Sequence, residues 1–402
     1  MNTFTGKEWG SGKEDPSLFN PANLDCGQWA EAARDFGAQS LTFLCKHHDG
    51  FCMWPSAYTR HSVKYSPWKA GQGDVVREIS EACRKAGLKF GIYLSPADLN
   101  HPAYGRDAAK YNDYYCGQLT ELLTNYGEIC EVFLDGAQPS PLQQGYDFQR
   151  YYRVIRELQP NAVISMRGPD VRWVGNEIGQ ARESEWSVVP IPVPPDKYDW
   201  PDRTALDLGS RKRIEGAKSL HWHPATAAVS LRRQWFWHPG QDSTIKSLPE
   251  LLRIYRHTVG RNAVLQLNLS SDNTGRIPDL DVARLREFGD ALRSLFTTNL
   301  VAGIGTTVEP MRTEADGTFM QRLKFQKPRR IKHVVLQEDI TKGQRVEAFE
   351  VALCEGGKTN KVLQATTIGW KRILDAGDVS AEELLLHITQ TRAPPFVTLS
   401  AY

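Results

Sequence analysis

The stretch DVVREISEACRKAGLKFGIYL, residues 74–94, contains the pattern that decides the fold. Its first half predicts a helix, because Asp74 is a suitable N-cap and Gly87 is a suitable residue just past the C-terminus. Its second half, residues 88–94, is almost continuously apolar, which is typical of a parallel strand that is covered on both faces. The stretch therefore predicts a helix that leads directly into a buried strand.

The same alternation extends through about the first three hundred residues. Further apolar runs predict strands at 40–46, 130–134, 162–166, 219–223 and 263–267, with a doubtful one around 183–189. Helical periodicity predicts helices at 27–36, 108–126, 146–158, 248–259 and 281–295. This alternation predicts an α/β fold, with a (β/α)8-like barrel favoured over a doubly wound sheet. No GxGxxG follows the first strand, which argues against a dinucleotide-binding domain.

The count of strands falls short of a closed barrel, which needs eight. Residues 1–25 are polar and contain Gly, Pro and Asn, so they predict no strand. We therefore expect a barrel whose first strand is absent or is supplied from outside this chain. Because an open seam exposes unpaired strand edges, we also expect the chain to form homo-oligomers.

The pattern changes after residue 296, where alternating segments separated by Gly, Pro and Asp/Asn turns replace the helices. They predict an all-β sandwich. We expect two domains, a catalytic barrel at 1–297 and a β-sandwich at 298–402. The Pro-rich stretch 188–202 is interpreted as a long ordered loop on the barrel.

Charge and cysteine content exclude several classes of protein. The 49 Lys and Arg nearly balance the 47 Asp and Glu, for a formal charge of +2, so no net charge favours nucleic acid or a membrane surface. The seven cysteines are scattered without a CxxC pair, which favours free thiols in a reducing compartment. With no long apolar run and no signal-like start, the sequence predicts a cytoplasmic protein and no membrane partner.

Polar side chains follow several predicted strands, at the end of a barrel where active sites lie. Asp135 follows the strand 130–134 directly, and His47 and His48 follow the strand 40–46. Arg167 follows 162–166, and the aromatic residues Trp54, Tyr93 and Trp235 lie near other strand ends. Each has a simpler interpretation: Asp135-Gly136 as a turn, the histidines as a solvated loop, and each aromatic residue as part of the core. Together they indicate a site for a polyhydroxylated ligand.

Two kinds of hydrolase chemistry fit these residues. Glycoside hydrolysis needs a second carboxyl group opposite Asp135, and the sequence offers Asp170, Glu177, Glu183 and Glu185. A zinc hydrolase is the alternative, because His221 and His223 would face the same way on a strand. His47 and His48 point to opposite faces of a strand and would not share a metal.

Several motifs together resemble the family 29 α-L-fucosidases over nearly the whole chain. They are NTFTGKEWG at 2–10, KHHDGFCMWPS at 46–56, GIYLSP at 91–96, VFLDG at 132–136, WVGNE at 173–177 and TVGRNAVLQLN at 258–268, with QEDITKGQRVEAF at 337–349 and ATTIGWKRI at 365–373 in the sandwich. The resemblance implies a (β/α)8-like barrel with a β-sandwich, retaining exo-hydrolysis of terminal α-L-fucose from a fucosylated oligosaccharide or glycoconjugate, and no cofactor. The WVGNE-type subgroup leans towards α-1,3/1,4-linked fucose.

The resemblance also implies roles for individual residues. Asp135 is the expected nucleophile and Glu177 the expected general acid/base, with Glu185 in reserve. Contacts to fucose are expected from Glu8, Trp9, His47, His48, Trp54, Tyr93, Arg167 and Trp235. The stretch PATAAVS at 224–230 departs from the family pattern, so recognition of the leaving group is expected to differ. A fucose-binding protein that has lost catalysis is the competing hypothesis, although both carboxylates are present.

Overall fold

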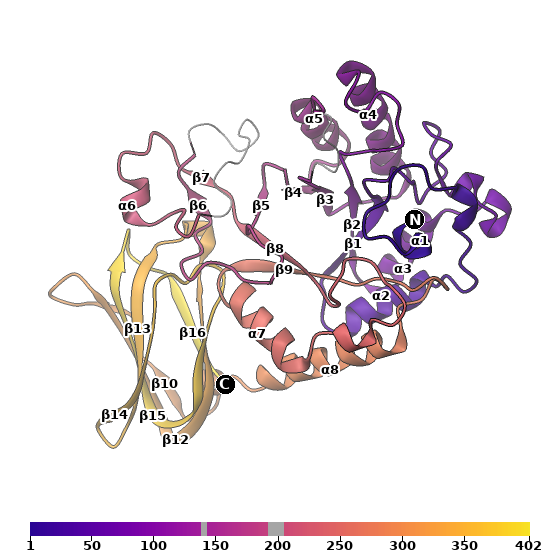
Figure 1. Cartoon of the computed structure of the whole chain (residues 1–402). Coiled ribbons are helices and arrows are strands. Elements are labelled where there is room, and N and C mark those ends of the chain that lie inside the picture. The colour runs from indigo at the N-terminus through magenta and orange to yellow at the C-terminus, as the bar shows by residue number, and fades with distance from the viewer. Residues whose placement is uncertain (138–142, 192–204) are drawn as a thin grey trace.

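A computed structural model shows an α/β part followed by a C-terminal β part (Figure 1). It describes residues 1–137, 143–191 and 205–402. Most of the Pro-rich stretch 188–202, expected to be a long loop, lies outside the described residues. The expected domain boundary after residue 297 stays a prediction and lies between the last helix of the α/β part and the first strands of the β part.

A curled, seven-stranded parallel sheet forms the centre of the α/β part. Its spatial order is β1-β2-β3-β4-β5-β8-β9, and every neighbouring pair is parallel. The strands are β1 (Ser40–Lys46), β2 (Lys89–Leu94), β3 (Glu131–Leu134), β4 (Val163–Met166), β5 (Val171–Trp173), β8 (Ala225–Ser230) and β9 (Ala263–Asn268). Their carboxyl ends therefore meet at one rim, where catalytic groups lie in folds of this kind. The predicted α/β class is confirmed.

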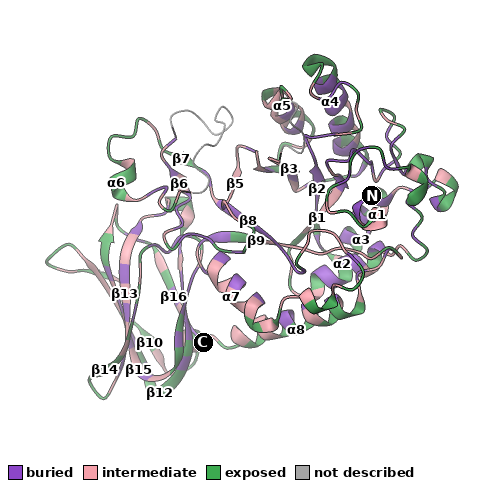
Figure 2. Ribbon diagram, in the orientation of Figure 1, coloured by how far each residue is buried: buried purple, intermediate pink, exposed green. Residues whose placement is uncertain are grey.

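Helices cover the outer face of this sheet, with buried sides inward and exposed sides outward (Figure 2). Asp74 accepts a hydrogen bond from the backbone of Arg77, and Gly87 has φ of 73°, so α3 begins and ends as predicted. The helices are α1 (Asn2–Thr5), α2 (Cys26–Asp35), α3 (Val75–Ala86), α4 (Ala108–Asn125), α5 (Phe148–Leu158), α6 (Arg211–Ile214), α7 (Leu248–Thr258) and α8 (Asp279–Leu295).

Two strands of the barrel differ from the prediction. The strand expected at 219–223 is present only as β7 (His221–Trp222), which pairs antiparallel with β6 (Val188–Val189) in a separate two-stranded sheet, so its expected place in the parallel sheet is wrong. The parallel sheet instead uses β5 and β8, which were not predicted. Because β8 consists of small residues and is buried along its whole length, its strand character depends on its neighbours and not on its own side chains. Within the stretch 224–230, residues 225–230 thus form a strand of the parallel sheet, and Pro224 directly precedes it.

Interactions across the interior bring β1 and β9 towards each other, although no pairing joins them among the described residues. The carboxylate of Glu131 on β3 accepts hydrogen bonds from Thr42 on β1 (2.5 Å), Ser165 on β4 (2.6 Å) and Gln266 on β9 (2.8 Å). Outside the sheet, Trp29 of α2 donates to the carbonyl of Gly275 (3.0 Å). The sheet is therefore curled, and the absence of a first strand stays a prediction.

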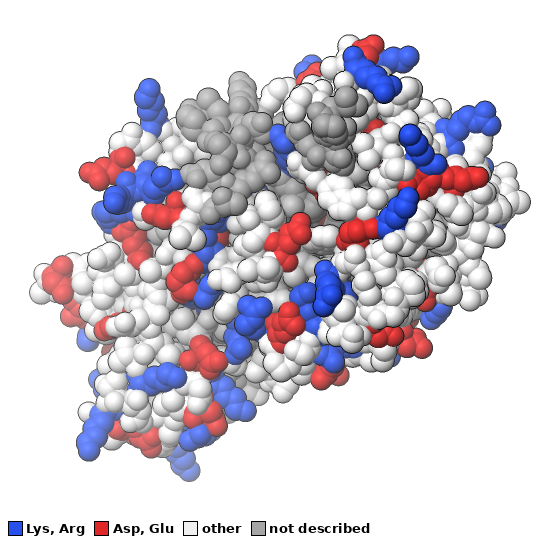
Figure 3. Space-filling view, viewed as in Figure 1, with Lys and Arg blue, Asp and Glu red and all other residues white. Residues whose placement is uncertain are grey.

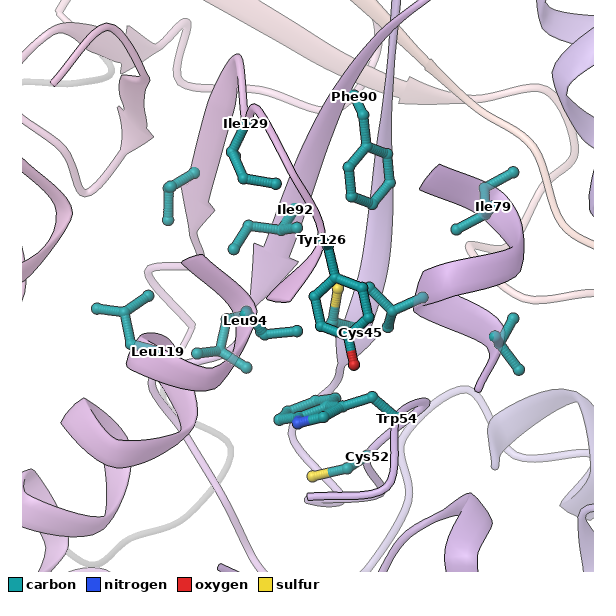
Figure 4. Packing of buried hydrophobic residues seen from close by; sticks show 14 of the residues in the cluster. Cys45, Cys52, Trp54, Ile79, Phe90, Ile92, Leu94, Leu119, Tyr126 and Ile129 are labelled. Atoms are coloured by element: carbon teal, nitrogen blue, oxygen red, sulfur yellow. The ribbon is translucent and has the colours of Figure 1, made fainter. Parts of the chain in front are cut away.

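The main core lies between the sheet and its helices. Figure 4 shows part of it, in which Trp54 lies between Cys52 and Tyr126, close to Cys45. All seven cysteines are free, as predicted. Among the described residues, no helix has the length and apolar character needed to cross a bilayer.

The C-terminal part is an antiparallel sheet domain with its own apolar core, which confirms its predicted β character. Its strands join in one hydrogen-bonded sheet, because β12 and β15 are each twenty residues long and pair with most of the others. The strands are β10 (Thr306–Val308), β11 (Arg312–Thr313), β12 (Phe319–Glu338), β13 (Val346–Glu355), β14 (Lys358–Ala365), β15 (Arg372–Thr391) and β16 (Val397–Ala401).

Candidate active site

Asp135 lies at the rim, directly after β3, where the sequence predicts it. The hydroxyl of Tyr93 donates to its Oδ2 (2.7 Å), and the backbone N–H of Ala137 donates to Oδ1 (2.7 Å). His48 Nε2 lies 3.9 Å from the same Oδ2. The Asp135 side chain remains 25% exposed, so the carboxylate is oriented by its neighbours and still accessible to a ligand.

His47 and His48 follow the end of β1 and do not lie on the strand, so their side chains do not point to opposite faces as expected, and their ring centroids are 4.0 Å apart. Nδ1 of His48 is paired with the hydroxyl of Ser95 (2.6 Å), and Nδ1 of His47 lies 3.3 Å from the amide of Asn2. Burial lowers the pKa of both histidines, although the nearby Asp135 carboxylate opposes this for His48. Both rings are therefore neutral at neutral pH, and each keeps one nitrogen for a ligand.

Aromatic rings surround these polar groups. Trp9 is 50% exposed and lies 4.8 Å from His48, centroid to centroid, and Phe236 contacts His47 edge to face at 5.0 Å. Burial, with Asp135 beside it, raises the pKa of Tyr93 well above its usual value, so Tyr93 stays protonated. Rings next to hydrogen-bonding groups suit a ligand with apolar and hydroxylated faces.

Glu8 connects the N-terminal segment to the loop after β8. Its carboxylate accepts hydrogen bonds from the backbone N–H groups of Trp235 (2.5 Å) and Phe236 (3.4 Å), and it lies 3.2 Å from Nε2 of His238. Glu8 therefore holds the loop that carries the two aromatic residues.

Glu177 is an exposed carboxylate on the loop after β5. Its Oε2 lies 3.3 Å from the indole Nε1–H of Trp235, which donates to it. The reserve candidate Glu185 is different: it is buried and paired with Arg172 and Arg182. Its lone pairs are thus occupied by guanidinium groups, and the geometry favours Glu177 as the second carboxylate.

The other acidic candidates are also occupied. Asp170 is paired with Arg156 (2.5 Å), and Glu183 pairs with Arg261 (2.7 Å) and with Arg372. Asp170 and Glu183 are thus bound to arginines and not to the residues around Asp135.

Arg167 and Trp54 occupy different surroundings. The backbone N–H of Arg167 donates to the carbonyl of Leu134 (3.0 Å), so the backbone of Arg167 lies next to the residue that precedes Asp135. The Arg167 guanidinium lies over the ring of Phe148, 5.0 Å from its centroid. Trp54, by contrast, is 2% exposed, and its Nε1–H donates to Glu121 (2.8 Å). The structure does not bring Trp54 to the rim, and its expected contact with a ligand stays a prediction.

A family model for α-L-fucosidases matches residues 5–294. The chain belongs to the α-L-fucosidase family. Alpha-L-fucosidase 1 of Arabidopsis thaliana is 36% identical over 429 residues, covering 99% of this chain and 82% of the relative. The chain is a glycoside hydrolase of this family.

Solved structures of family members are similar over the full length of the chain. A glycoside hydrolase 29 family member from an unknown rumen bacterium is 38% identical, with a TM-score of 0.88, and the match covers 100% of this chain and 73% of that one. A Ruminococcus gnavus family 29 fucosidase in complex with fucose is 27% identical, with a TM-score of 0.87 and coverage of 100% and 90%.

The geometry does not favour the zinc alternative for this fucosidase. Nε2 of His221 lies 3.2 Å from the hydroxyl of Ser219, and Nε2 of His223 lies 3.3 Å from the carbonyl of Gly168. Within residues 1–137, 143–191 and 205–402, no three His, Cys, Asp or Glu side chains gather in a way that could hold a metal ion. The two histidines were expected to face the same way on one strand of the parallel sheet. No such strand contains them, because β7 pairs with β6 in a separate sheet.

Sequence reasoning missed several residues of the fucosidase site. Phe236 was missed because β8 was not recognised, so only its neighbour Trp235 was assigned to a strand end. Ser95 and Asn2 were missed because they act on the histidines through side-chain hydrogen bonds, which no spacing reveals. The face shown in Figure 3 has interspersed acidic and basic side chains, in keeping with the balanced composition.

Proposed function

We propose that the protein is a retaining exo-α-L-fucosidase that releases terminal fucose from glycans through a covalent fucosyl-enzyme. The observation that carries this proposal is the position of Asp135: an accessible carboxylate at the barrel rim, oriented by Tyr93 and close to a neutral His48. The complex of a relative with fucose supports the choice of sugar.

The reaction proceeds in two steps. Asp135 Oδ attacks C1 of fucose as the C1–O bond to the leaving group breaks, and Glu177 gives its proton to the departing oxygen. Glu177, now a carboxylate, takes a proton from water as that water attacks C1 and releases Asp135. A retaining pair of carboxyl groups should lie about 5–5.5 Å apart with the sugar bound.

The surrounding residues suit a deoxy sugar. His47, His48, Tyr93 and Arg167 are expected to bind hydroxyl groups, while the rings of Trp9 and Phe236 would contact apolar parts of the sugar. Glu8 and Trp235 would complete the site at its far side, and Trp54 would support it from the core.

The nucleophile is tested by trapping. Incubation with a 2-deoxy-2-fluoro fucosyl donor, followed by proteolysis and mass spectrometry, should label the peptide that contains Asp135. Asp135→Asn should abolish labelling and turnover, whereas Asp113→Asn, an exposed carboxylate of α4, should retain both. Label on a different peptide of an active enzyme contradicts the assignment.

The acid/base is tested by substrate choice. Glu177→Gln should lower kcat/KM for a fucosyl disaccharide by about a hundredfold or more, because its sugar leaving group needs protonation. Hydrolysis of 2-chloro-4-nitrophenyl α-L-fucoside should suffer much less, and azide should yield fucosyl azide. Glu157→Gln, exposed on α5, is the matched control. Proportional loss on both substrates would assign Glu177 another role.

We propose a preference for α-1,3/1,4-linked fucose, on the basis of the WVGNE-type motif at 173–177. A panel of linkage-defined fucosyl oligosaccharides tests it, and faster release from α-1,2 or α-1,6 linkages contradicts it.

The alternatives are a fucose-binding protein without turnover and a metal-dependent hydrolase; the first predicts binding without product, and the second predicts loss of activity with a chelator.

We also propose that the chain self-associates through the edges of β1 and β9, which no described strand covers. Val264 on β9 is 53% exposed, and unpaired strand edges favour pairing with another chain. Sedimentation velocity should show a dimer or larger species. A fully active monomer at micromolar concentration contradicts this proposal.

A further inference from the structure

The loop that carries Glu177 connects β5 to β6 across residues 174–187. Its tip is closed on itself: the Asn176 side chain donates to the carbonyl of Gln180 (2.7 Å) and accepts from the backbone N–H groups of Ile178 and Gln180 (3.3 Å each). Gly179 has φ of 69°, and a Cβ there would lie 2.7 Å from Ile254 of α7. The tip is thus a closed unit, so its position depends on what holds its two ends.

The α/β part holds both ends of the tip, residues 174–182. At the start, the backbone N–H of Val174 donates to the carbonyl of Thr226 on β8 (2.8 Å). At the end, the backbone N–H of Ala181 donates to the carbonyl of His257 on α7 (2.8 Å). Arg182 donates to the carbonyl of Val174 (3.2 Å), which ties the two ends to each other.

The C-terminal sheet domain holds the part of the loop that follows, residues 183–187. Gln344 donates to the carbonyl of Glu185 (3.1 Å) and accepts from the backbone N–H of Ser187 (2.7 Å). Arg372 donates to the carbonyl of Glu183 (2.6 Å) and also pairs with its carboxylate. Gln344 and Arg372 are each only 4% exposed, so both are buried between the two domains.

A second amide completes this network from the barrel side. Asn262 has φ of 62°, and its Nδ2 donates to the carbonyl of Glu185 (2.9 Å) and to the hydroxyl of Ser187 (3.1 Å). Its Oδ1 accepts from the backbone N–H of Trp370 in the C-terminal domain (2.7 Å). Buried amides whose groups are all bonded make a rigid junction, since an unbonded one would carry a desolvation penalty.

We propose that the C-terminal domain is a positioning element for the general acid/base: Gln344 and Arg372 clamp residues 183–187 and thereby fix Glu177 against Trp235. The inference rests on the proposed role of Glu177. Gln344 and Arg372 touch no reacting atom, so they are positioning residues. Loss of the clamp should therefore impair proton donation to the leaving group and leave attack by Asp135 intact.

The test compares kcat/KM, which reports the step that forms the fucosyl-enzyme, for two substrates. Gln344→Ala and Arg372→Met should each lower kcat/KM for a fucosyl disaccharide by about tenfold or more, with a much smaller change for 2-chloro-4-nitrophenyl α-L-fucoside. Arg330→Met is the matched control, because Arg330 pairs with Asp378 on an exposed part of the same domain. Arg372→Lys should restore part of the loss.

The outcomes separate this inference from the assignment of Glu177. If Glu177→Gln shows the selective loss and folded clamp variants lose both activities in proportion, or lose neither, the clamp has no positioning role. If Glu177→Gln shows no selective loss, the acid/base assignment itself fails. Should Gln344→Ala or Arg372→Met not fold, as judged by circular dichroism, Thr366→Val removes the exposed bonds to the hydroxyl of Ser184 (2.6 Å) and to the carbonyl of Glu183 (3.4 Å) and should show a smaller loss of the same selectivity. A folded Thr366→Val enzyme without that selectivity then overturns the inference.

Discussion

A buried ion pair lies beneath the histidines of the rim, and its disruption should be costly. Lys46 is the last residue of β1, and its Nζ lies 3.0 Å from Oδ2 of Asp98, with both side chains 0% exposed. The ammonium also donates to Gln118 (2.8 Å) and lies 5.2 Å from the centre of the Tyr114 ring. Asp98→Asn keeps the size of the side chain but leaves the ammonium without its counter-charge.

The expected cost follows from burial. Removing one partner of a buried pair typically costs about 3–5 kcal/mol, because the other charge stays desolvated. Asp98 Oδ1 also accepts backbone N–H groups from Asn100 and His101 (3.0 Å each), and an asparagine oxygen can keep those bonds. The loss should therefore come from the charge and not from the turn. It is a large share of the roughly 5–15 kcal/mol that stabilises a typical protein.

Guanidinium unfolding, followed by tryptophan fluorescence, measures this loss. Lys46→Met should be similarly destabilising, and the double variant Lys46→Met/Asp98→Asn should recover part of the stability, because it removes both charges while the asparagine oxygen can still accept from the backbone of Asn100 and His101. An Asp98→Asn protein within about 1 kcal/mol of the wild type refutes the reasoning, since a dry, charged ammonium cannot lose its partner at so small a cost.

Three further predictions concern single side chains. Tyr93→Phe removes the donor to Asp135 and should lower kcat/KM by roughly ten- to a hundredfold, equivalent to about 1.5–3 kcal/mol, whereas the exposed Tyr58→Phe should not. Burial lowers the pKa of His223 to about 3 from 6.5, so its contribution to stability is present above pH 6.5 and lost as the pH falls towards 3. In the wild type, the free energy of unfolding should therefore decrease as the pH falls from about 6 to 4. His223→Gln should reduce this decrease by up to about 1.4 kcal/mol per pH unit, and an unchanged slope contradicts the prediction. Ellman's reagent should label the native protein slowly and mainly at Cys130, whose pKa burial raises to about 11, while rapid labelling of several thiols contradicts the buried assignment.

The strands that sequence analysis predicted correctly are those whose own residues favour a strand. The apolar runs of β1, β2 and β3 are of this kind, and each ends at a rim residue. β8 could not be recognised, because the sequence ATAAVS has little strand preference and becomes a strand only between β5 and β9. The reverse error occurred at 219–223, where an apolar run forms only the two-residue strand β7, which pairs with β6 outside the parallel sheet.

The candidate site also contains residues that the sequence places correctly and residues whose role depends on their neighbours in space. Position along the chain places Asp135, His47 and His48 at strand ends, and the structure brings them together. The choice between Glu177 and Glu185 depends on which side chains surround each carboxylate. Only the three-dimensional arrangement shows two arginines around Glu185 and none of its oxygens free for a substrate.

The pairing of β5 with β8 has a consequence for the order of folding. Trp173 pairs with Thr226 across a connection that contains β6, β7 and α6, whereas the shorter connections between successive strands from β1 to β4 each contain one α-helix. Closing a longer loop costs more chain entropy, so the β5–β8 contact should form after the β1–β4 region. Pulse-labelled hydrogen exchange should accordingly protect the amides of β2 and β3 before those of β8, and the carboxylate of Glu177 should reach its place only in the last stage of assembly.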